Sequence, residues 1–316
     1  MKRKILFRAD AGQSIGYGHF IRTLALADML KDDFECVYYT QSPTEYQKKE
    51  LSKVCSLVEL PADKSRFELF LRYLQGDEII VLDNYFYTTE YQRQIKRKGC
   101  KLVCIDDMHD KHYFADAVVN HGYAKPEEFD CEPYTKLCLG SKWSLLRKQF
   151  LVPIKEHERK RQIVVCFGGA DPQQLTDRVV SYLLKLAVPY EIVVVLGDAA
   201  YISDDNRKRV TIMHNLTAQE MAYLFETSSI GILPASSVRI EAVSRGLKVI
   251  CGYFVDNQQI GYERSLEYKD IVPVYNLNEL TLERINKALI DVDSFTFNVP
   301  DYSSVPKNYI ELMLSL

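Results

Sequence analysis

A chain of 316 residues is longer than a typical single domain and suggests two domains. Its 47% apolar and 26% charged residues are ordinary for a globular enzyme. A formal net charge of -3 gives no reason to expect a nucleic-acid partner, because nucleic-acid-binding domains usually carry a basic excess. No apolar run is long enough to span a bilayer, and the run before Arg8 is too short for a signal peptide. We therefore expect a cytoplasmic protein without membrane insertion.

Eight cysteines occur, and no two of them form a Cys-x-x-Cys pair. Cys36, Cys104, Cys166 and Cys251 lie inside predicted apolar strands. Free cysteines of this kind behave as small apolar side chains in a reducing compartment. We therefore expect neither a disulfide framework nor a zinc site.

The first half of the chain alternates short apolar runs with amphipathic segments. Residues 4–8 are typical of a strand buried on both faces, and residues 19–30 carry apolar side chains at helical spacing. Further strands are predicted at 34–39, 78–83, 101–106 and 117–120, and further helices at 44–54, 65–74 and 89–98. Strands that alternate with helices imply βαβ units and a doubly wound parallel sheet.

A second series of strands and helices follows a linker-like stretch with Pro153 and a charged run at 155–161. Strands are predicted at 162–167, 191–196, 209–213, 230–233 and 248–251, with helices at 217–226 and 238–245 and one more helix after 277. Asp171 as N-cap and Pro172 at the first helical position predict where another helix, ending near 186, begins.

The sequence thus predicts an α/β protein with two doubly wound, Rossmann-like domains and a cleft between them. We expect an N-terminal domain at 1–155 and a C-terminal domain at 160–300. A last amphipathic helix at about 305–316 is expected to pack back on the N-terminal domain.

The loop Gly16-Tyr17-Gly18-His19 lies between the first strand and the first helix. Its glycines let the backbone turn tightly, so that a bound group can approach the helix N-terminus closely. His19 is the only side chain there that can exchange a proton near neutral pH, which indicates catalysis; a histidine satisfied by a backbone group is the alternative. A dinucleotide fingerprint is disfavoured, because Ile21 replaces its third glycine and Glu35 lies at the wrong end of the second strand.

Two later loops also follow strands and open helices. Gly168-Gly169-Ala170-Asp171 places glycines before a helix N-terminus, which suits a diphosphate. Pro234-Ala235-Ser236-Ser237 offers hydroxyls for phosphate oxygens, and Glu241 one turn later can accept from both ribose hydroxyls. A tight turn and a serine N-cap are the structural alternatives. Because all three loops follow strand ends, we expect them to face one cleft.

An acidic stretch, Asp106-Asp107-Met108-His109-Asp110 with His112, contains residue types that bind metals. Its residues fit no standard metal-ligand spacing, and an acidic turn after a strand is common. We therefore expect no metal, and the sequence leaves the roles of Asp106 and Asp107 open.

Taken together, these motifs resemble those of the UDP-2,4-diacetamido-2,4,6-trideoxy-β-L-altropyranose hydrolases of the pseudaminic acid pathway. The resemblance runs in order through roughly residue 260 and covers most of the chain. It is carried by Arg8-Ala9-Asp10, Gly16 to His19 with Arg22 and Leu24, Asp83-Asn84-Tyr85, Asp106-Asp107, Gly140, Leu146-Arg147, Phe150, Gly168 to Asp171, Ala235 to Ser237, Glu241 and Asn257-Gln258. That family is similar in fold to GT-B glycosyltransferases, including the transferase that makes lipid II.

The resemblance implies that His19 is the general base for a water that attacks the anomeric carbon, with inversion and release of UDP by C–O cleavage. It implies a small-molecule UDP-sugar substrate, no metal and no cofactor, and we expect a monomer. The implied substrate-binding residues are Gly16, Gly18, Arg22, Tyr85, Asn257 and Gln258. The implied UDP-binding residues are Gly168, Gly169, Ser236, Ser237 and Glu241.

The same motifs leave other functions open. A GT-B glycosyltransferase that uses a UDP-sugar donor would share every nucleotide-side feature, and a non-catalytic nucleotide-sugar-binding protein would need no base. Asn84 stands where the family often has histidine, and Trp143 where it usually has tyrosine. The sequence therefore leaves the identity and stereochemistry of the sugar open.

Overall fold

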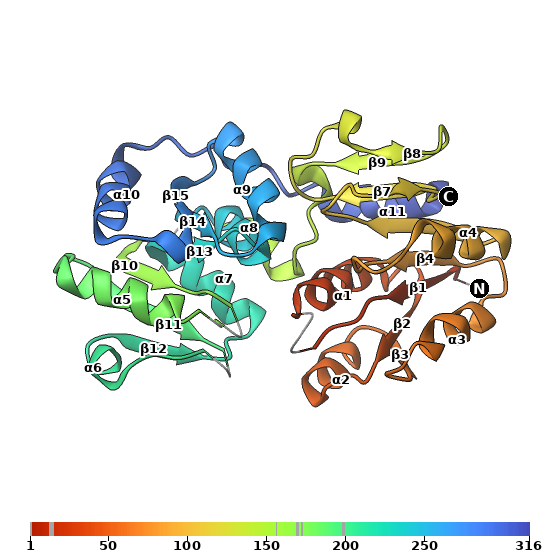
Figure 1. Cartoon of the computed structure of the whole chain (residues 1–316), viewed down its shortest axis with the longest axis horizontal. Coiled ribbons are helices and arrows are strands. Elements are labelled where there is room, and N and C mark those ends of the chain that lie inside the picture. The colour runs from red at the N-terminus through yellow and green to blue at the C-terminus, as the bar shows by residue number, and fades with distance from the viewer. Residues whose placement is uncertain (1, 13–15, 156, 169–170, 172, 198–199) are drawn as a thin grey trace. The chain divides into compact units, whose positions relative to one another are not determined.

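The computed structural model describes residues 2–12, 16–155, 157–168, 171, 173–197 and 200–316. The chain folds into two units, one made of Met1–Lys148 with Asp301–Leu316 and the other of Gln149–Pro300. In each unit, helices cover both faces of a parallel sheet (Figure 1). The predicted α/β class with doubly wound sheets is confirmed.

The described residues of the first unit form a seven-stranded parallel sheet in the order β3-β2-β1-β4-β5-β7-β9. Its strands are β1 (Lys4–Arg8), β2 (Glu35–Gln41), β3 (Ser56–Leu60), β4 (Ile79–Leu82), β5 (Lys101–Ile105), β7 (Ala117–Asn120) and β9 (Lys136–Leu139). The chain winds outward from β1 to one edge and then from β4 to the other, so the strand order reverses between β1 and β4. Open parallel sheets bind ligands at the carboxyl ends of the strands beside such a reversal.

Helices connect these strands. They are α1 (Gly18–Leu30), α2 (Glu45–Leu51), α3 (Ser65–Tyr73), α4 (Thr89–Arg97) and the C-terminal α11 (Val305–Ser315). The boundaries of α4 follow from local chemistry: the Thr88 hydroxyl accepts from the Tyr91 N–H at its start, and Gly99 at φ +93° follows its end. Short pieces complete the unit: β6 (His112–Tyr113), β8 (Asp130–Cys131) and 3-10 turns at Pro126–Glu128 and Ser141–Trp143.

Sequence reasoning missed β3 and β9, which are the two edge strands of this sheet. The central β4 is buried at every position, whereas β3 and β9 are exposed at their first residue and each has only one buried position, Leu60 and Cys138. An edge strand is covered less completely, so it lacks the continuous apolar run by which the central strands were recognised.

The described residues of the second unit form a six-stranded parallel sheet in the order β12-β11-β10-β13-β14-β15, which reverses between β10 and β13. The strands are β10 (Lys160–Val165), β11 (Glu191–Leu196), β12 (Thr211–His214), β13 (Ser228–Pro234), β14 (Lys248–Tyr253) and β15 (Val272–Asn276). The helices are α5 (Leu175–Lys185), α6 (Asp204–Arg207), α7 (Ala218–Thr227), α8 (Ser237–Ser244), α9 (Asp256–Tyr268) and α10 (Leu282–Ser294), with 3-10 turns at Lys148–Phe150 and Leu277–Glu279.

The predicted start of the first helix of this unit is wrong. Pro172 lies outside the described residues, and α5 begins at Leu175. Asp171 and Gln174 have positive φ values of 37° and 52°, so a left-handed turn delays the helix. Asp171 still caps it from a distance, because its carboxylate accepts the N–H groups of Leu175 and Thr176 at 2.9 and 2.8 Å.

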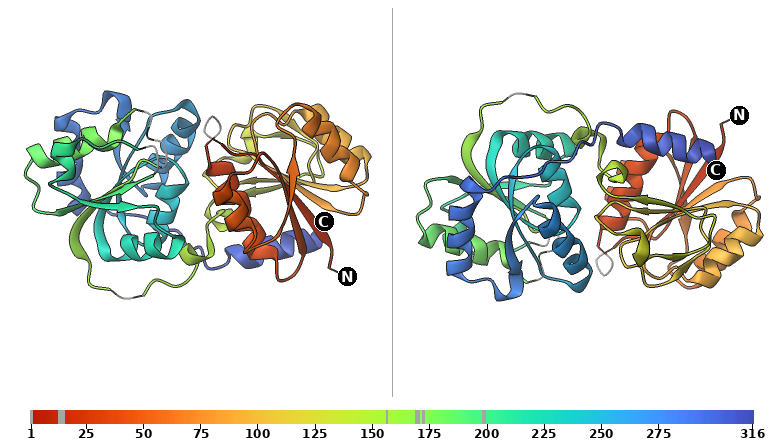
Figure 2. Two further views of the ribbon diagram at one scale, coloured as in Figure 1. Left: turned by 90° about the horizontal axis from the view of Figure 1, so that it is seen from below. Right: turned by 90° about the horizontal axis from the view of Figure 1, so that it is seen from above.

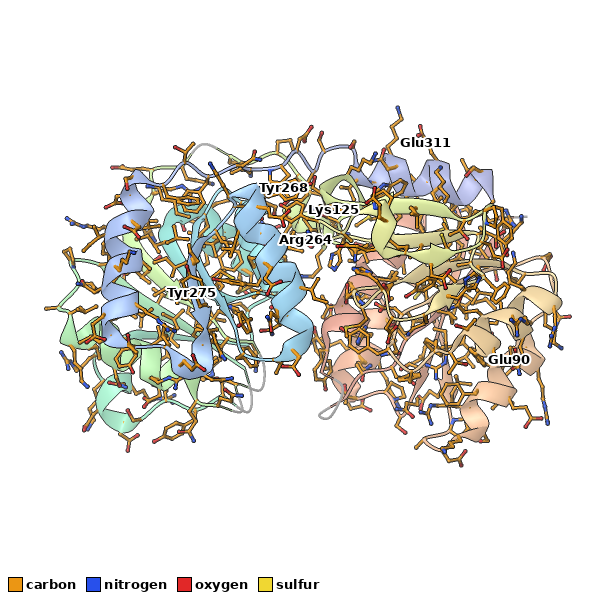
Figure 3. All side chains as sticks on the ribbon, turned by 45° about the horizontal axis from the view of Figure 1, so that its top comes forward. Glu90, Lys125, Arg264, Tyr268, Tyr275 and Glu311 are labelled. Atoms are coloured by element: carbon orange, nitrogen blue, oxygen red, sulfur yellow. The ribbon has the colours of Figure 1, made fainter. Side chains whose placement is uncertain are left out.

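The prediction also lacked α9 and β15. The sequence of α9 is mostly polar and contains Gly261, so it shows no clear apolar stripe. Its Arg264 and Tyr268 lie one turn apart, and Tyr275 follows on β15 (Figure 3). The formation of α9 and β15 therefore depends on tertiary packing, which the sequence pattern does not reveal.

The last helix, α11, packs against α1 within the first unit (Figure 2). Tyr309 is fully buried and its hydroxyl donates to the Trp143 carbonyl, with the two rings 5.3 Å apart. Glu311 points away from the unit (Figure 3), whereas Leu312 is fully buried. The C-terminal segment thus completes the core of the first unit.

All eight cysteines are free. Burial raises the pKa of Cys36, Cys138 and Cys251 to about 12, which keeps these thiols protonated and unreactive at neutral pH. In the part of the chain that the structure describes, no helix combines the length and the apolar character needed to cross a membrane.

Two leucines of α11 test how much its packing stabilises the first unit. We expect Leu312→Ala to lower the free energy of unfolding by about 2–5 kcal/mol, because it opens a cavity in the core. Leu314 on the same helix is 69% exposed, so Leu314→Ala is the matched control and should change stability by less than about 0.5 kcal/mol. Urea unfolding followed by fluorescence of the single tryptophan, Trp143, reports on this unit. Equal effects of the two variants would contradict the assignment.

Candidate active site

His19 lies beyond the carboxyl end of β1, where the order of the first sheet reverses. The loop before it closes on itself: the Gly16 N–H donates to the Gly12 carbonyl at 2.8 Å, and the reverse bond is 3.4 Å. Gly16 has φ +81°, which glycine adopts without strain. Helix α1 then begins at Gly18 and places His19, only 6% exposed, in its first turn.

Asp83 holds the ring of His19. It directly follows β4, the strand that pairs with β1, and it is fully buried. Its Oδ1 lies 2.7 Å from the Nδ1 of His19. The Nη2 of Arg22 also lies 3.2 Å from this nitrogen, farther away than the carboxylate oxygen. Because the closer partner is a carboxylate, which can only accept, we assign the proton to Nδ1, and the Nε2 of a neutral ring is left as the acceptor.

Arg22, one turn after His19 on α1, joins two carboxylates. Its Nε and Nη2 donate to the two oxygens of Asp83, and its Nη1 donates to Asp107, each at 2.5 Å. Burial alone would raise the pKa of Asp83, but Arg22 and His19 outweigh burial and lower it below its usual range. Burial alone would also raise the pKa of Asp107. The nearby Arg22 and His121 outweigh burial and lower this pKa as well. Both carboxylates are therefore ionised at neutral pH.

Tyr85 and His121 complete this group. The Tyr85 hydroxyl donates to Asp107 at 3.3 Å, and its ring meets the ring of His19 edge-on with centroids 4.6 Å apart. The Nε2 of His121 lies 3.4 Å from Arg22 and 3.8 Å from Asp107. Tyr85 is 39% exposed, whereas Asp107 and His121 are partly buried and His19, Arg22 and Asp83 are buried, so Tyr85 is the most exposed member. We call His19, Arg22, Asp83, Tyr85, Asp107 and His121 the His19 cluster.

A second buried group ties together the loops that carry His19 and Asp83. Arg8, the last residue of β1, pairs with Asp10, and both are fully buried. The Asp10 N–H donates to the Asn84 side chain at 2.7 Å, and the Asn84 amide donates back to the Asp10 carbonyl at 3.2 Å. The backbone after β1 is therefore fixed to the backbone after β4.

The predicted UDP-binding residues flank the reversal of the second sheet. Gly168 follows β10 at φ +88°, and a Cβ added there would meet no described atom within 4 Å. Ser236 and Ser237 follow β13 and begin α8; among the described residues the Ser236 hydroxyl makes no capping hydrogen bond. Glu241, one turn later, is 5% exposed. The structure thus brings these four residues to neighbouring strand ends, where a nucleotide would bind in such a sheet.

The remaining predicted substrate residues lie elsewhere in the second unit. Asn257 and Gln258 lie in the first turn of α9, after β14. The Oε1 of Gln258 accepts from the Phe254 N–H at 3.2 Å, so this side chain fixes the entry to its own helix. Gly169 lies outside the described residues, as does the side chain of Asn257.

Asp106 does not join the His19 cluster. One of its carboxylate oxygens accepts from both the N–H and the Nδ1 of His109 at 2.8 Å, and Asn120 donates to its carbonyl at 2.8 Å. These contacts shape the turn after β5. Within the described residues, no group of three or more His, Cys, Asp or Glu side chains could hold a metal ion.

Sequence reasoning did not single out Asp83, Asp107 and His121 as partners of His19. A signal was present, because each residue follows a strand closely: Asp83 after β4, Asp107 after β5 and His121 after β7. These strands are consecutive neighbours in the sheet, so their carboxyl ends meet at one edge. The order of the strands in the sheet therefore brings these three residues together in one site.

The chain was compared with known proteins. No family model matches it. The UDP-2,4-diacetamido-2,4,6-trideoxy-beta-L-altropyranose hydrolase of Campylobacter jejuni is 28% identical over 295 residues, covering 84% of this chain and 99% of that protein. The spore coat polysaccharide biosynthesis protein SpsG of Bacillus subtilis is 24% identical over 265 residues, covering 79% of this chain and 77% of that protein. The resemblance predicted from the motifs is confirmed.

Among solved structures, MurG of Acinetobacter baumannii has a TM-score of 0.69 at 12% sequence identity, and the match covers 100% of both chains. The chain has the GT-B fold. At this identity the likeness concerns the fold alone.

The charge balance of the His19 cluster can be tested by removing its guanidinium. We expect Arg22→Met to lower the free energy of unfolding by about 3–5 kcal/mol at pH 7, because it leaves two carboxylates without their cation. Arg72→Met is the control: Arg72 pairs with Glu68 on the surface of the same unit, and its loss should cost less than about 0.5 kcal/mol.

The pH dependence gives a second readout of the same variant. In the native protein the lowered pKa values of Asp83 and Asp107 add stability that is present above the unfolded value of about 3.9 and is lost as the pH falls through the native values. Without Arg22 both native pKa values rise, so the deficit of the variant should shrink as the pH is lowered from 7 to about 4. A deficit that stays constant over this range would contradict the account.

Proposed function

We propose that this protein hydrolyses a UDP-linked 2,4-diacetamido-2,4,6-trideoxy sugar to free sugar and UDP, in the biosynthesis of a nonulosonic (pseudaminic) acid or of a surface polysaccharide. The similarity to the Campylobacter jejuni hydrolase extends over 99% of that protein, and SpsG is named for polysaccharide biosynthesis. The single observation that carries the proposal is the His19–Asp83 pair at the reversal of the first sheet.

The proposed chemistry begins at the Nε2 of His19. This nitrogen accepts a proton from a water, which attacks the anomeric carbon of the sugar. The bond between that carbon and the diphosphate oxygen breaks, and its electron pair leaves with UDP. Attack on the face opposite to the leaving group inverts the anomeric centre. Tyr85, partly exposed and in contact with the His19 ring, is proposed to contact the sugar.

The leaving group is proposed to bind at the second unit. Gly168 and the first turn of α8 present backbone groups beside a helix N-terminus. The partial positive charge of that N-terminus favours a bound diphosphate and stabilises the negative charge that develops on UDP as it leaves. Glu241 is proposed to accept hydrogen bonds from the ribose. Gly16, Gly18, Arg22, Asn257 and Gln258 remain proposed substrate-side residues, with Arg22 acting through the carboxylates that it binds.

The first experiment removes the base. His19→Ala should lower the rate of UDP release on the order of 10²–10⁴-fold and leave UDP binding intact, because the base and the diphosphate site lie in different units. His112→Ala is the control: His112 bonds to Asp130 and Glu132, away from the His19 cluster, so its loss should leave turnover unchanged.

The product identifies the reaction. NMR of the sugar formed in ¹⁸O-labelled water should show the label on the anomeric oxygen. Wild-type protein that releases no sugar without an acceptor, but transfers it once an acceptor is added, would instead indicate a glycosyltransferase. Protein that binds UDP-sugar and never turns it over would indicate a binding function.

The nucleotide side is tested separately. Glu241→Gln removes one acceptor oxygen and the charge, and we expect it to weaken UDP binding by about tenfold, in line with the loss of a charge-assisted hydrogen bond. Glu263→Gln on the exposed side of α9 is the matched control and should leave UDP affinity unchanged. Calorimetric titration with UDP measures both variants. Equal affinities would remove Glu241 from the proposed site.

A further inference from the structure

The carboxylate of Asp83 is buried although the residue lies in the loop after a strand. It follows β4, yet both its oxygens bond to side chains of α1 and it is fully buried. Oδ1 accepts hydrogen bonds from the Nδ1 of His19 and the Nη2 of Arg22, while Oδ2 accepts one from the Nε of Arg22. The carboxylate is thus held from two directions and cannot turn without losing its bonds.

We infer that Asp83 is the positioning residue of the proposed hydrolase: it fixes His19 in the tautomer with the proton on Nδ1, and Arg22, anchored by Asp107, fixes Asp83 in turn. This inference rests on the proposed function for its catalytic consequence. The tautomer itself is a property of the protein without substrate. A neutral histidine with its proton on Nδ1 presents a lone pair on Nε2, which is what a general base requires.

The charges of the His19 cluster favour the same role. Leaving the two histidines aside, Arg22 contributes one positive charge and Asp83 and Asp107 contribute two negative charges, so one negative charge is unbalanced. When His19 takes a proton from water, the imidazolium balances it. A buried cluster is stabilised by neutrality, and it therefore favours the charged base that forms in the transition state.

Two buried tyrosines close to α1 do not supply this charge. Tyr38 on β2 bonds to the Thr23 hydroxyl at 2.5 Å, and burial raises its pKa well above the usual value. Tyr309 on α11 is fully buried as well, and burial likewise raises its pKa. Both phenols stay neutral near pH 7, and neither adds a charge beside His19.

Two substitutions separate positioning from charge. Asp83→Asn and Asp107→Asn each remove one negative charge, and both residues bind Arg22, but only Asp83 bonds to His19. An asparagine at 83 can donate its amide to Nδ1 and stabilise the opposite tautomer, whose Nε2 has no lone pair to offer. We expect kcat for UDP release to fall on the order of 10³–10⁴-fold in Asp83→Asn, with KM changed less than about threefold. In Asp107→Asn we expect a fall of about tenfold or less.

The tautomer is read without any substrate. In ¹⁵N-histidine-labelled full-length protein, the His19 resonances, assigned by their loss in His19→Ala, should show Nδ1 protonated and Nε2 unprotonated above neutral pH. Asp83→Asn should shift the signal toward the Nε2-protonated form, and Asp107→Asn should leave it unchanged. Retention of the secondary structure is checked by circular dichroism.

The outcomes are distinguishable. A wild-type spectrum with Nε2 protonated overturns the inference, even if Asp83→Asn fails to fold. Equal losses of kcat in the two variants, with an unchanged tautomer, overturn it as well and leave charge as the only contribution. If the wild-type protein hydrolyses no UDP-sugar, the proposed function fails, and the spectra still decide whether Asp83 sets the tautomer of His19.

Discussion

The candidate active site depends on one buried contact, the carboxylate of Asp83 against α1. Asp83 belongs to the loop after β4, whereas its partners His19 and Arg22 belong to the helix after β1. An ion that is withdrawn so completely from water persists only when its oxygens are satisfied by donors. The placement of α1 and the ionisation of Asp83 therefore require each other, and the histidine is positioned by the same bonds that hold the helix against the sheet.

A second buried pair makes the surrounding backbone rigid. Asp10 binds Arg8 and also accepts the Gln41 N–H at 2.9 Å, at the end of β2, while Asn84 exchanges hydrogen bonds with its backbone. The segments after β1, β2 and β4 are thus joined to one another. A general base acts efficiently only when its ring is held in one orientation, and a network of this kind limits the motion of the segments around it.

The sequence was sufficient for the buried parts of the fold and for the loops that follow the central strands. Strands such as β4 are continuous apolar runs, and the glycines before His19 mark a tight turn in any context. It was insufficient where the structure depends on distant partners: the edge strand β3, the polar helix α9, and the left-handed turn before α5. The same holds for the site. Arg22 meets Asp83 and Asp107 across 61 and 85 residues of chain, and only the order β1-β4-β5 in the sheet brings them together.

The two sheets share one type of reversal but offer opposite electrostatic environments. The reversal of the first sheet carries Asp83 and Asp107 with a single guanidinium between them, which favours a histidine that becomes positive and disfavours a diphosphate. The reversal of the second sheet carries Gly168 and the start of α8, where backbone donors favour the diphosphate. A displacement by water needs both environments, because the base gains positive charge while the leaving group gains negative charge. The two sheets of this fold supply these environments separately, one in each unit.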